Sequence, residues 1–232
     1  MDSKNIYVYA IEGLDASGKE TASKGVLKLL KHNIHDMNIM RHAFPDYNTL
    51  TGKRIGELLN KNRTEDENYE FDELFIQNRK EIIDNIRHMD LIYKDTILIC
   101  DRYYFSSLFY DTEINVDSKK EIINRLTEIE YREVCGAGVI TPNITFCLSV
   151  NLDTILSRLS RRKHIDLNET EEHQTRFYNR YCKILDVIKD KNNYNNSIIE
   201  IIDGNTKPDI IQNTIYKSIL NNIVNLQRGG NL

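Results

Sequence analysis

The chain has 232 residues with 28% charged residues, and its formal net charge at pH 7 is −4. This length is typical of one large α/β domain, and the slightly acidic balance excludes a general attraction to nucleic acid or to an acidic membrane. No apolar run approaches the roughly 20 residues that a membrane-spanning helix requires. The four cysteines are widely spaced and the N-terminus lacks signal-peptide features, which together predict a cytoplasmic protein with free thiols.

The first predicted element is a strand over residues 6–11, which runs into a glycine-containing loop and then a helix. The loop has the spacing of a phosphate-binding loop, with Gly13 at its start and a glycine directly before Lys19. Backbone amides and the helix dipole would converge there on an anion, and Lys19 would add positive charge. Glu20 stands where the pattern expects a magnesium-binding hydroxyl. An ordinary turn between strand and helix is the alternative interpretation.

The remaining elements alternate between strands and helices. Apolar, β-branched runs predict strands over 38–44, 96–100, 144–150 and 198–202. Helical periodicity predicts helices over 22–31, 51–59, 71–86, 118–134, 153–161 and 177–188, and from 208 onward. A polar connector is expected over 60–68 and a frayed tail over 227–232. This order predicts an α/β fold: a five-stranded parallel sheet flanked by helices on both faces, in a single domain over 1–226.

Charged residues follow the predicted strand 96–100, at the edge where a parallel sheet usually carries its chemistry. Asp101 and Arg102 come directly after this buried-type run. Because a buried strand rarely ends in charges without partners, the pair suggests a metal-supporting carboxylate and a phosphate-binding guanidinium. A helix-capping aspartate beside a surface arginine is the plainer alternative.

A second source of positive charge lies later in the chain, at Arg158, Arg161, Arg162 and Lys163. Such a run is usually a solvated surface. Here the acidic stretch 166–172 and an amphipathic helix follow it, so a flap over about 158–172 could close on a phosphate and exclude water.

Phe75 and Arg79 are four residues apart on a predicted helix and therefore share a face. An aromatic ring and a guanidinium so placed could hold a flat base by stacking and hydrogen bonding. Spacing alone slightly favours the alternative, in which Phe75 is core and Arg79 is exposed.

Several of these motifs, taken together in one order, resemble the thymidylate kinase family over about residues 5–220. They are Glu12 to Lys19, Phe44-Pro45, Phe75 with Arg79, Asp101-Arg102-Tyr103 with Ser106, Ser107 and Tyr110, and the flap around 166–169. The resemblance implies a P-loop NTPase fold with a small lid, and transfer of the ATP γ-phosphoryl group to the 5′-phosphate of dTMP, giving dTDP. It further implies Mg²⁺ as a cofactor, small-molecule nucleotides as partners, and a homodimer formed through helices.

The resemblance also implies a set of site residues. ATP would be bound by Gly13, Leu14, Asp15, Ala16, Ser17, Gly18, Lys19, Glu20 and Thr21. The acceptor would be bound by Asp15, Phe44, Pro45, Phe75, Arg79, Arg102, Tyr103, Ser106, Ser107 and Tyr110. The catalytic group would comprise Lys19, Asp101, Arg102, Arg158, Arg161 and Arg162. Because Ala16 occupies the position of a loop arginine, one of the three lid arginines would take over its role, with Arg161 as the first choice. Asp101 would hold the metal, with Glu20 as a further candidate.

The chain departs from the family pattern at four positions. Glu20 replaces the usual hydroxyl residue, and Tyr47 stands where many relatives carry an arginine for the acceptor phosphate. Phe109 and Asp111 stand where alanine and glutamine are common. Three functions therefore stay open: a dTMP kinase, a kinase for another deoxynucleoside or deoxynucleotide, and a catalytically silent nucleotide-binding protein.

Overall fold

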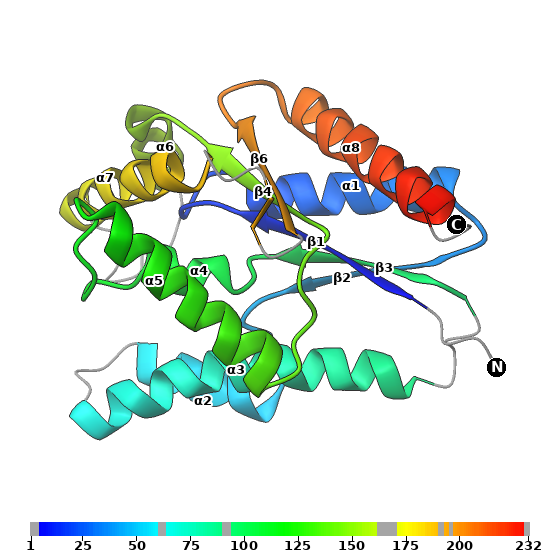
Figure 1. The fold of residues 1–232 in the computed structure, drawn as a ribbon. Coiled ribbons are helices and arrows are strands. Elements are labelled where there is room, and N and C mark those ends of the chain that lie inside the picture. The colour runs from blue at the N-terminus through cyan, green and yellow to red at the C-terminus, as the bar shows by residue number, and fades with distance from the viewer. Residues whose placement is uncertain are drawn as a thin grey trace.

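A single sheet forms the centre of the protein. The computed structural model describes residues 5–59, 64–89, 94–161, 171–189, 193–194 and 197–229. Its strands are β1 (Ile6–Glu12), β2 (Asn38–Ala43), β3 (Thr96–Asp101), β4 (Ile144–Ser149), β5 (Asn193–Tyr194) and β6 (Ser197–Asp203), in the order β2-β3-β1-β4-β6-β5 (Figure 1). Five strands are parallel, which confirms the predicted sheet, and β5 adds a short antiparallel edge that was not predicted.

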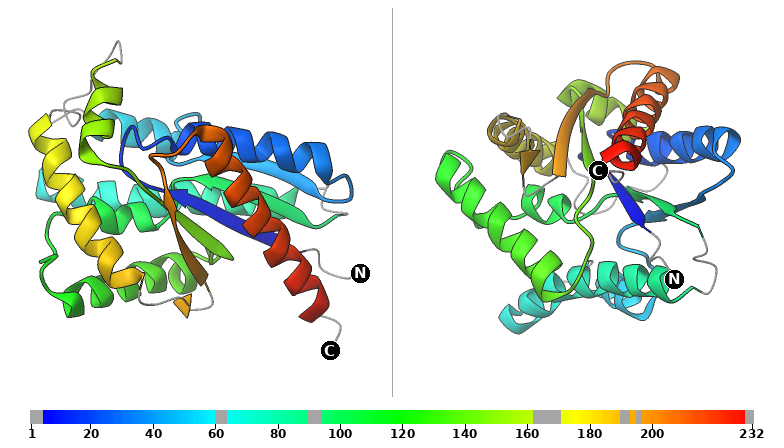
Figure 2. Two further views of the ribbon diagram at one scale, coloured as in Figure 1. Left: turned by 90° about the horizontal axis from the view of Figure 1, so that it is seen from above. Right: turned by 45° about the vertical axis from the view of Figure 1, so that its right-hand side comes forward.

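Helices cover both faces of this sheet, as predicted (Figure 2). They are α1 (Lys19–Asn33), α2 (Leu50–Leu59), α3 (Glu65–His88), α4 (Phe105–Phe109), α5 (Lys119–Glu130), the π-helical turn η1 (Tyr131–Gly136), α6 (Leu152–Leu159), α7 (Glu171–Ile188) and α8 (Pro208–Gly229). Strand residues alternate between the faces: Tyr9 and Ile11 pack with α1 and α8, whereas Val8 and Ala10 pack with α3, α4, α5 and α7. None of the described helices is long and apolar enough to cross a membrane.

Several elements differ from the sequence predictions. The short helix α4 was not predicted, and α7 begins at Glu171 instead of near residue 177, so it includes the last two residues of the predicted flap. The connector predicted over 60–68 is wrong for its last part, because Thr64 and Glu67 form a capping box that starts α3 at Glu65. The helix predicted over 118–134 is divided into α5 and η1. Helix α8 continues to Gly229, so it extends into the segment predicted to be a frayed tail.

The strand register brings separate parts of the chain to one edge of the sheet. Ile11 of β1 and Ala43 of β2 both lie opposite Asp101 at the end of β3. Because the three strands are parallel, the loops that follow them begin at the same level. The phosphate-binding loop, the Phe44-Pro45 turn and the Asp101-Arg102 pair therefore meet there.

Candidate active site

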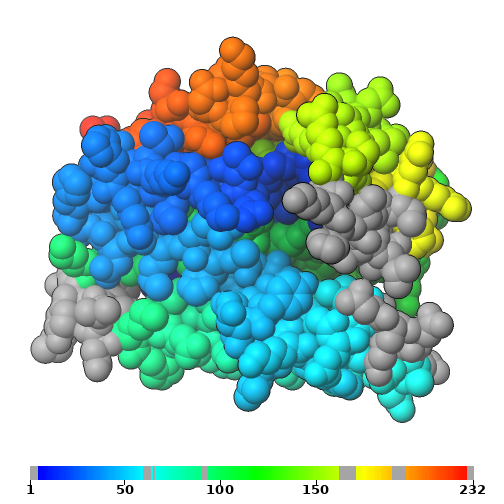
Figure 3. Space-filling view, turned by 180° about the vertical axis from the view of Figure 1, so that it is seen from behind, coloured from blue at the N-terminus to red at the C-terminus, as the bar shows by residue number. Residues whose placement is uncertain are grey.

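A cavity of about 660 Å³ opens at this edge of the sheet. Figure 3 shows the hollowed face on which blue atoms of the N-terminal segment lie between the orange start of α8 and the cyan α2 and α3. The lining includes every residue from Asp15 to Thr21, together with Arg41, Phe44, Pro45, Tyr47, Asp101, Arg102, Arg158, Gly204 and Thr206. The structure thus brings Lys19, Asp101, Arg102 and Arg158 together around one space. Of the predicted acceptor residues, Phe75, Arg79, Tyr103, Ser106, Ser107 and Tyr110 are not among the described residues that line it.

The phosphate-binding loop joins β1 to α1. Gly18 caps α1 with a φ of 102°, a left-handed conformation that glycine adopts without strain. Lys19 is buried, and its Nζ donates to the Leu14 carbonyl oxygen at 2.6 Å. Burial, assisted by the charge of Arg102, lowers the pKa of Lys19 to about 7. The lysine therefore titrates near neutral pH when no anion is bound.

This pKa would make the expected binding of ATP depend on pH. At pH 8 the free Lys19 is mostly neutral, and a bound triphosphate would restore its ordinary pKa, so we expect uptake of about one proton per ATP. Calorimetry in two buffers of different ionisation enthalpy measures this uptake. Lys19→Arg, which stays charged, should abolish the uptake; an unchanged uptake in this variant would contradict the role given to Lys19.

Arg102 forms a compact polar cluster with the loop. Its Nη2 donates to Asp15 Oδ1 and, at 3.3 Å, to the Tyr110 hydroxyl, which itself donates to Asp15 Oδ2 at 3.1 Å. Nη1 donates to the Gly13 carbonyl at 3.3 Å, and the guanidinium lies 5.2 Å from the centre of the Tyr110 ring. Arg102 has a φ of 67°, a left-handed conformation rare outside glycine and common at functional sites.

Glu12, the last residue of β1, holds the turn that carries Arg102. It was not predicted as a site residue. Its fully buried carboxylate accepts from the Tyr103 amide at 2.8 Å, the Ser106 amide at 3.0 Å and the Ser106 hydroxyl at 2.6 Å. Burial raises the pKa of Glu12, while the Ser106 hydrogen bond and the charge of Arg102 oppose that shift. The end of β1 is thereby tied to the turn that carries Arg102. A buried-type strand that ends in a carboxylate before a glycine was the available signal.

Asp101 has two partners that the sequence analysis missed. Its Oδ2 accepts from Arg41 Nη2 at 2.5 Å and from the Ser23 hydroxyl at 3.2 Å, and Arg41 Nε donates to Ser23 at 2.7 Å. Arg41 lies on β2 and lines the cavity, so it adds a further positive charge there. The sequence around Arg41, a weak and polar strand pattern, does not indicate a contact with Asp101.

The residues around Asp101 fit a magnesium ion. Magnesium commonly binds to proteins through one or two carboxylates and takes its other ligands from water and phosphates. Asp101 offers a carboxylate at the cavity wall, with Oδ2 already oriented by Arg41 and Ser23. Glu20 also lines the cavity, but its exposed side chain pairs with Lys24 at 2.5 Å. Asp101 is therefore the better-placed candidate.

The predicted base-binding residues lie on α3 and beside it. Phe75 packs edge-on against Phe71, with ring centres 5.0 Å apart. Arg79 is 2% exposed, which excludes the alternative of a solvent-exposed arginine, and its Nη2 donates to the Ser107 hydroxyl at 3.2 Å. The Tyr103 hydroxyl donates to the Ile140 carbonyl oxygen at 2.9 Å, so this ring is held in place.

Two of the departures from the family pattern lie outside the cavity lining. Phe109 is fully buried and packs against Tyr181, with ring centres 4.7 Å apart. Asp111 accepts from Arg125 Nε at 2.6 Å. Tyr47, in contrast, lines the cavity and is half exposed.

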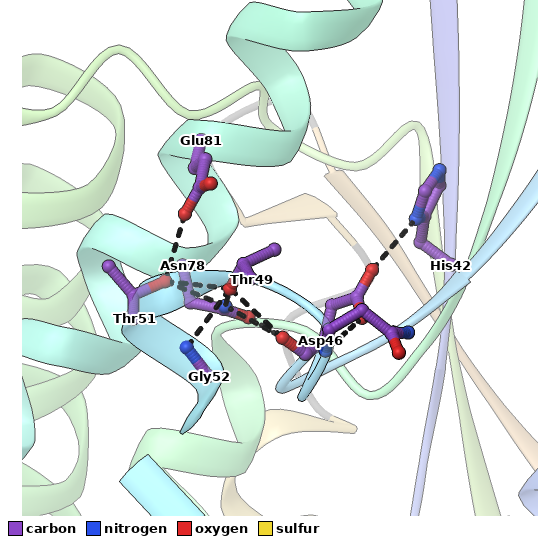
Figure 4. Close-up of polar contacts among 8 residues, drawn as sticks. His42, Asp46, Thr49, Thr51, Gly52, Asn78 and Glu81 are labelled. Atoms are coloured by element: carbon purple, nitrogen blue, oxygen red, sulfur yellow. Dashed lines mark hydrogen bonds and ion pairs between the residues drawn. The ribbon is translucent and has the colours of Figure 1, made fainter. Parts of the chain in front are cut away.

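The turn that carries Tyr47 is fixed by Asn78 of α3 (Figure 4). The Asn78 side chain is fully buried; it accepts from the Asp46 amide at 2.8 Å and donates to the hydroxyls of Thr49 at 2.8 Å and Thr51 at 2.9 Å. Thr49 in turn accepts from the Gly52 amide at 3.0 Å. This network holds the turn against α3 and so positions one wall of the cavity.

Gly52 is required by close packing within this network. A Cβ atom at Gly52 would lie 1.9 Å from the Asp46 carbonyl oxygen, whereas one at Gly56 would meet only the Tyr47 ring at 3.6 Å. We expect Gly52→Ala to destabilise the protein by about 1–3 kcal/mol or more, and Gly56→Ala on the same helix to be neutral or stabilising by up to about 1 kcal/mol. Urea unfolding measures both; equal stability of the two variants would refute this packing constraint.

The predicted lid is described only in part. Arg158 of α6 lines the cavity, and its Nη1 donates to the carbonyl oxygens of Ala16 at 3.1 Å and Ser17 at 3.0 Å. Arg161 lies in an exposed turn after α6 and is not among the described lining residues. Arg162 and residues 163–170 lie outside the described residues, so their predicted roles stay predictions.

The fold and this cavity together define a class of protein. A phosphate-binding loop follows the central strand, positively charged side chains converge on it, and a carboxylate lies at the end of the neighbouring strand. These are the parts of a P-loop enzyme that binds nucleotides.

Comparison with known proteins gives the family. The thymidylate kinase family model matches residues 11–215. A thymidylate kinase of Buchnera aphidicola is 31% identical over 216 residues, covering 90% of this chain and 92% of that protein. One of Plasmodium falciparum is 29% identical over 180 residues, covering 78% of each chain. The structure of Candida albicans thymidylate kinase matches with a TM-score of 0.64 and 25% identity, covering 96% of this chain and 94% of that chain. The chain belongs to the thymidylate kinase family and is a phosphotransferase enzyme.

Proposed function

We propose that this enzyme transfers the γ-phosphoryl group of ATP to the 5′-phosphate of dTMP, giving dTDP. The observation that carries the proposal is the convergence of Lys19, Arg102 and Arg158 with Asp101 on a single cavity beside the phosphate-binding loop. Family membership supports the nucleotide acceptor. We further propose that the enzyme is a homodimer, as the resemblance implies, and that it acts in the cytoplasm, as its widely spaced cysteines predict.

The proposed roles follow from the positions of the side chains. The loop amides and Lys19 bind the ATP phosphates. Arg102 grips the acceptor phosphate, and Asp15, which contacts Arg102, binds the sugar 3′-hydroxyl. With both phosphates held, positioning and electrostatic stabilisation by these residues lower the barrier without a covalent intermediate. A bound Mg²⁺, held by Asp101 directly or through water, would neutralise charge on the phosphates.

The acceptor base and sugar would lie beyond the phosphate cavity. Two observations support this arrangement. Phe75 is partly exposed on α3, and Arg79 donates a hydrogen bond to the Ser107 hydroxyl. Phe75 would stack on the base, while Arg79 and Ser107 read its polar edge. Tyr103 would fill the space that a 2′-hydroxyl needs, so the site would prefer deoxynucleotides.

A coupled assay of ADP release tests this function against its alternatives. The acceptors are dTMP, dUMP, dCMP, dGMP and thymidine, each with Mg²⁺ and ATP. We expect the highest kcat/KM with dTMP. Preference for dCMP or thymidine would overturn the acceptor assignment alone, whereas no release with any acceptor, despite measurable ATP binding, would overturn the kinase function.

The contribution of the lid arginines can be separated by mutation. Because Arg158 lines the cavity and contacts the loop, Arg158→Ala should lower kcat by about 10²-fold or more, a typical loss for a group that stabilises transition-state charge. The ATP KM should change less than kcat if the interaction forms mainly in the transition state. Arg161→Ala is the matched comparison. A larger loss in that variant would return the catalytic role to Arg161.

A further inference from the structure

The turn that follows α5 has an unusual backbone geometry. Helix α5 ends at Glu130, and η1 continues it as a π-helical turn, in which the Ala137 amide donates to the Arg132 carbonyl oxygen at 2.9 Å. A π-helical turn holds one more residue than an α-helical turn, which changes the direction of the following side chains, and such turns are frequent at functional sites. Its backbone is further fixed because the Val139 amide donates to the Glu133 carbonyl oxygen at 2.9 Å.

This turn directs Glu133 toward α3, which lies close to the end of α5 in Figures 1 and 2. Glu133 is 1% exposed and meets Arg79, which is 2% exposed. Arg79 Nε donates to Glu133 Oε2 at 3.0 Å, and Arg79 Nη2 donates to Glu133 Oε1. Both carboxylate oxygens therefore bind a single guanidinium group.

A buried ion pair of this kind contributes little to the stability of the fold. Removing two charges from water costs several kcal/mol per ion, and an apolar pair of similar volume is often equally stable. The pair does restrict Arg79 to one orientation, because Nε and Nη2 are both engaged and Nη2 also reaches Ser107. Within the described residues, no hydrogen bond is recorded for Nη1 of Arg79.

The remaining N–H donors of Arg79 determine which groups on a base can bind there. A guanidinium has N–H donors and no acceptor. A base with a carbonyl oxygen at pyrimidine position 4, as in thymine or uracil, can accept from Nη1. Cytosine presents an amino group at that position, so two donors would face each other, and both would lose hydrogen bonds to water.

We propose that Glu133 is a positioning residue that selects the base. By fixing Arg79 from the π-helical turn, it makes the acceptor site favour pyrimidines with a 4-carbonyl group and discriminate against 4-aminopyrimidines. A loosely held arginine could turn away from the amino group and would discriminate less. This inference rests on the proposed function, because it assigns the base-binding side of the same site.

The test compares binding and turnover of dTMP and dCMP in the full-length protein. Glu133→Gln removes the charge and one acceptor while keeping the shape of the side chain. We expect the ratio of dTMP to dCMP affinity, and of kcat/KM, to fall about tenfold or more. The loss should appear in the KM for dTMP, with the KM for ATP little changed. Glu133→Asp should keep part of the selectivity.

Glu73→Gln is the matched control. Glu73 of α3 accepts from Arg132 of η1, so this variant breaks an ion pair between the same two elements, but one that is partly exposed. Its selectivity ratio should equal that of the wild type. If Glu73→Gln lowers the ratio as much as Glu133→Gln does, a general loosening of η1 explains the effect and the proposal is overturned.

Two further results keep the inference open to refutation. If Glu133→Gln folds and its selectivity ratio is unchanged, the proposal is wrong. If it does not fold, the Arg79→Met/Glu133→Leu double variant removes the buried charges together, and a retained preference for dTMP would equally overturn the proposal. Should the wild type bind dTMP without phosphorylating it, calorimetric affinities still test Glu133, whereas the proposed kinase function fails separately.

Discussion

Arg102→Ala is expected to lower kcat/KM for dTMP by about 30- to 5,000-fold, the equivalent of about 2–5 kcal/mol for truncating one partner of a buried charge pair. The guanidinium is already oriented by Asp15, Tyr110 and the Gly13 carbonyl oxygen. An acceptor phosphate would therefore lose a planar, bidentate partner that is already oriented. Steady-state kinetics with dTMP as the varied substrate measure the effect.

Two variants define what this loss means. Arg102→Lys keeps the charge but not the planar fork, and should recover only part of the activity. Arg54→Ala removes an arginine that pairs with Glu70 on α3, outside the cavity lining, and should leave the kinetics unchanged. Near-normal kcat/KM in Arg102→Ala would show that the acceptor phosphate is bound elsewhere.

Glu12→Ala should be the most destabilising of the substitutions near the site. It leaves two backbone amides and the Ser106 hydroxyl without their buried acceptor. At about 1–3 kcal/mol for each unsatisfied buried group, we expect a loss of at least about 3 kcal/mol in the free energy of unfolding. Part of the loss is offset because burial already disfavours the carboxylate, as its raised pKa indicates. Urea unfolding gives the value directly.

Glu12→Gln separates the hydrogen bonds from the charge. The amide oxygen still accepts from the backbone of Tyr103 and Ser106, so this variant should be clearly more stable than Glu12→Ala. It should also keep Arg102 in place and retain most of the activity. Equal stability of Glu12→Ala and the wild type would mean that the turn after β3 does not depend on Glu12.

The phosphate-binding loop and the strand ends could be predicted because their signals are local. Gly13, Lys19 and the residues between them are consecutive, and the strand–loop–helix order around them is readable from periodicity. Asp101 and Arg102 follow directly on a buried strand, and both line the cavity. The spacing of Phe75 and Arg79 suggested a base-binding pair but slightly favoured an exposed arginine, because spacing on a helix cannot tell a buried arginine from an exposed one; the family resemblance favoured the base-binding roles.

The pattern of strands and helices, the phosphate-binding loop and the family can all be read from the order of the amino acids. The partners of the charged groups cannot, because they lie far apart in the chain: Arg41 pairs with Asp101, 60 residues away, Glu133 with Arg79, 54 away, and Glu12 with Ser106, 94 away. Such pairs arise because parallel strands and a π-helical turn bring distant residues together. The hydrophobic periodicity of the sequence carries no information about such long-range contacts, so the geometry of the site is a property of the folded chain.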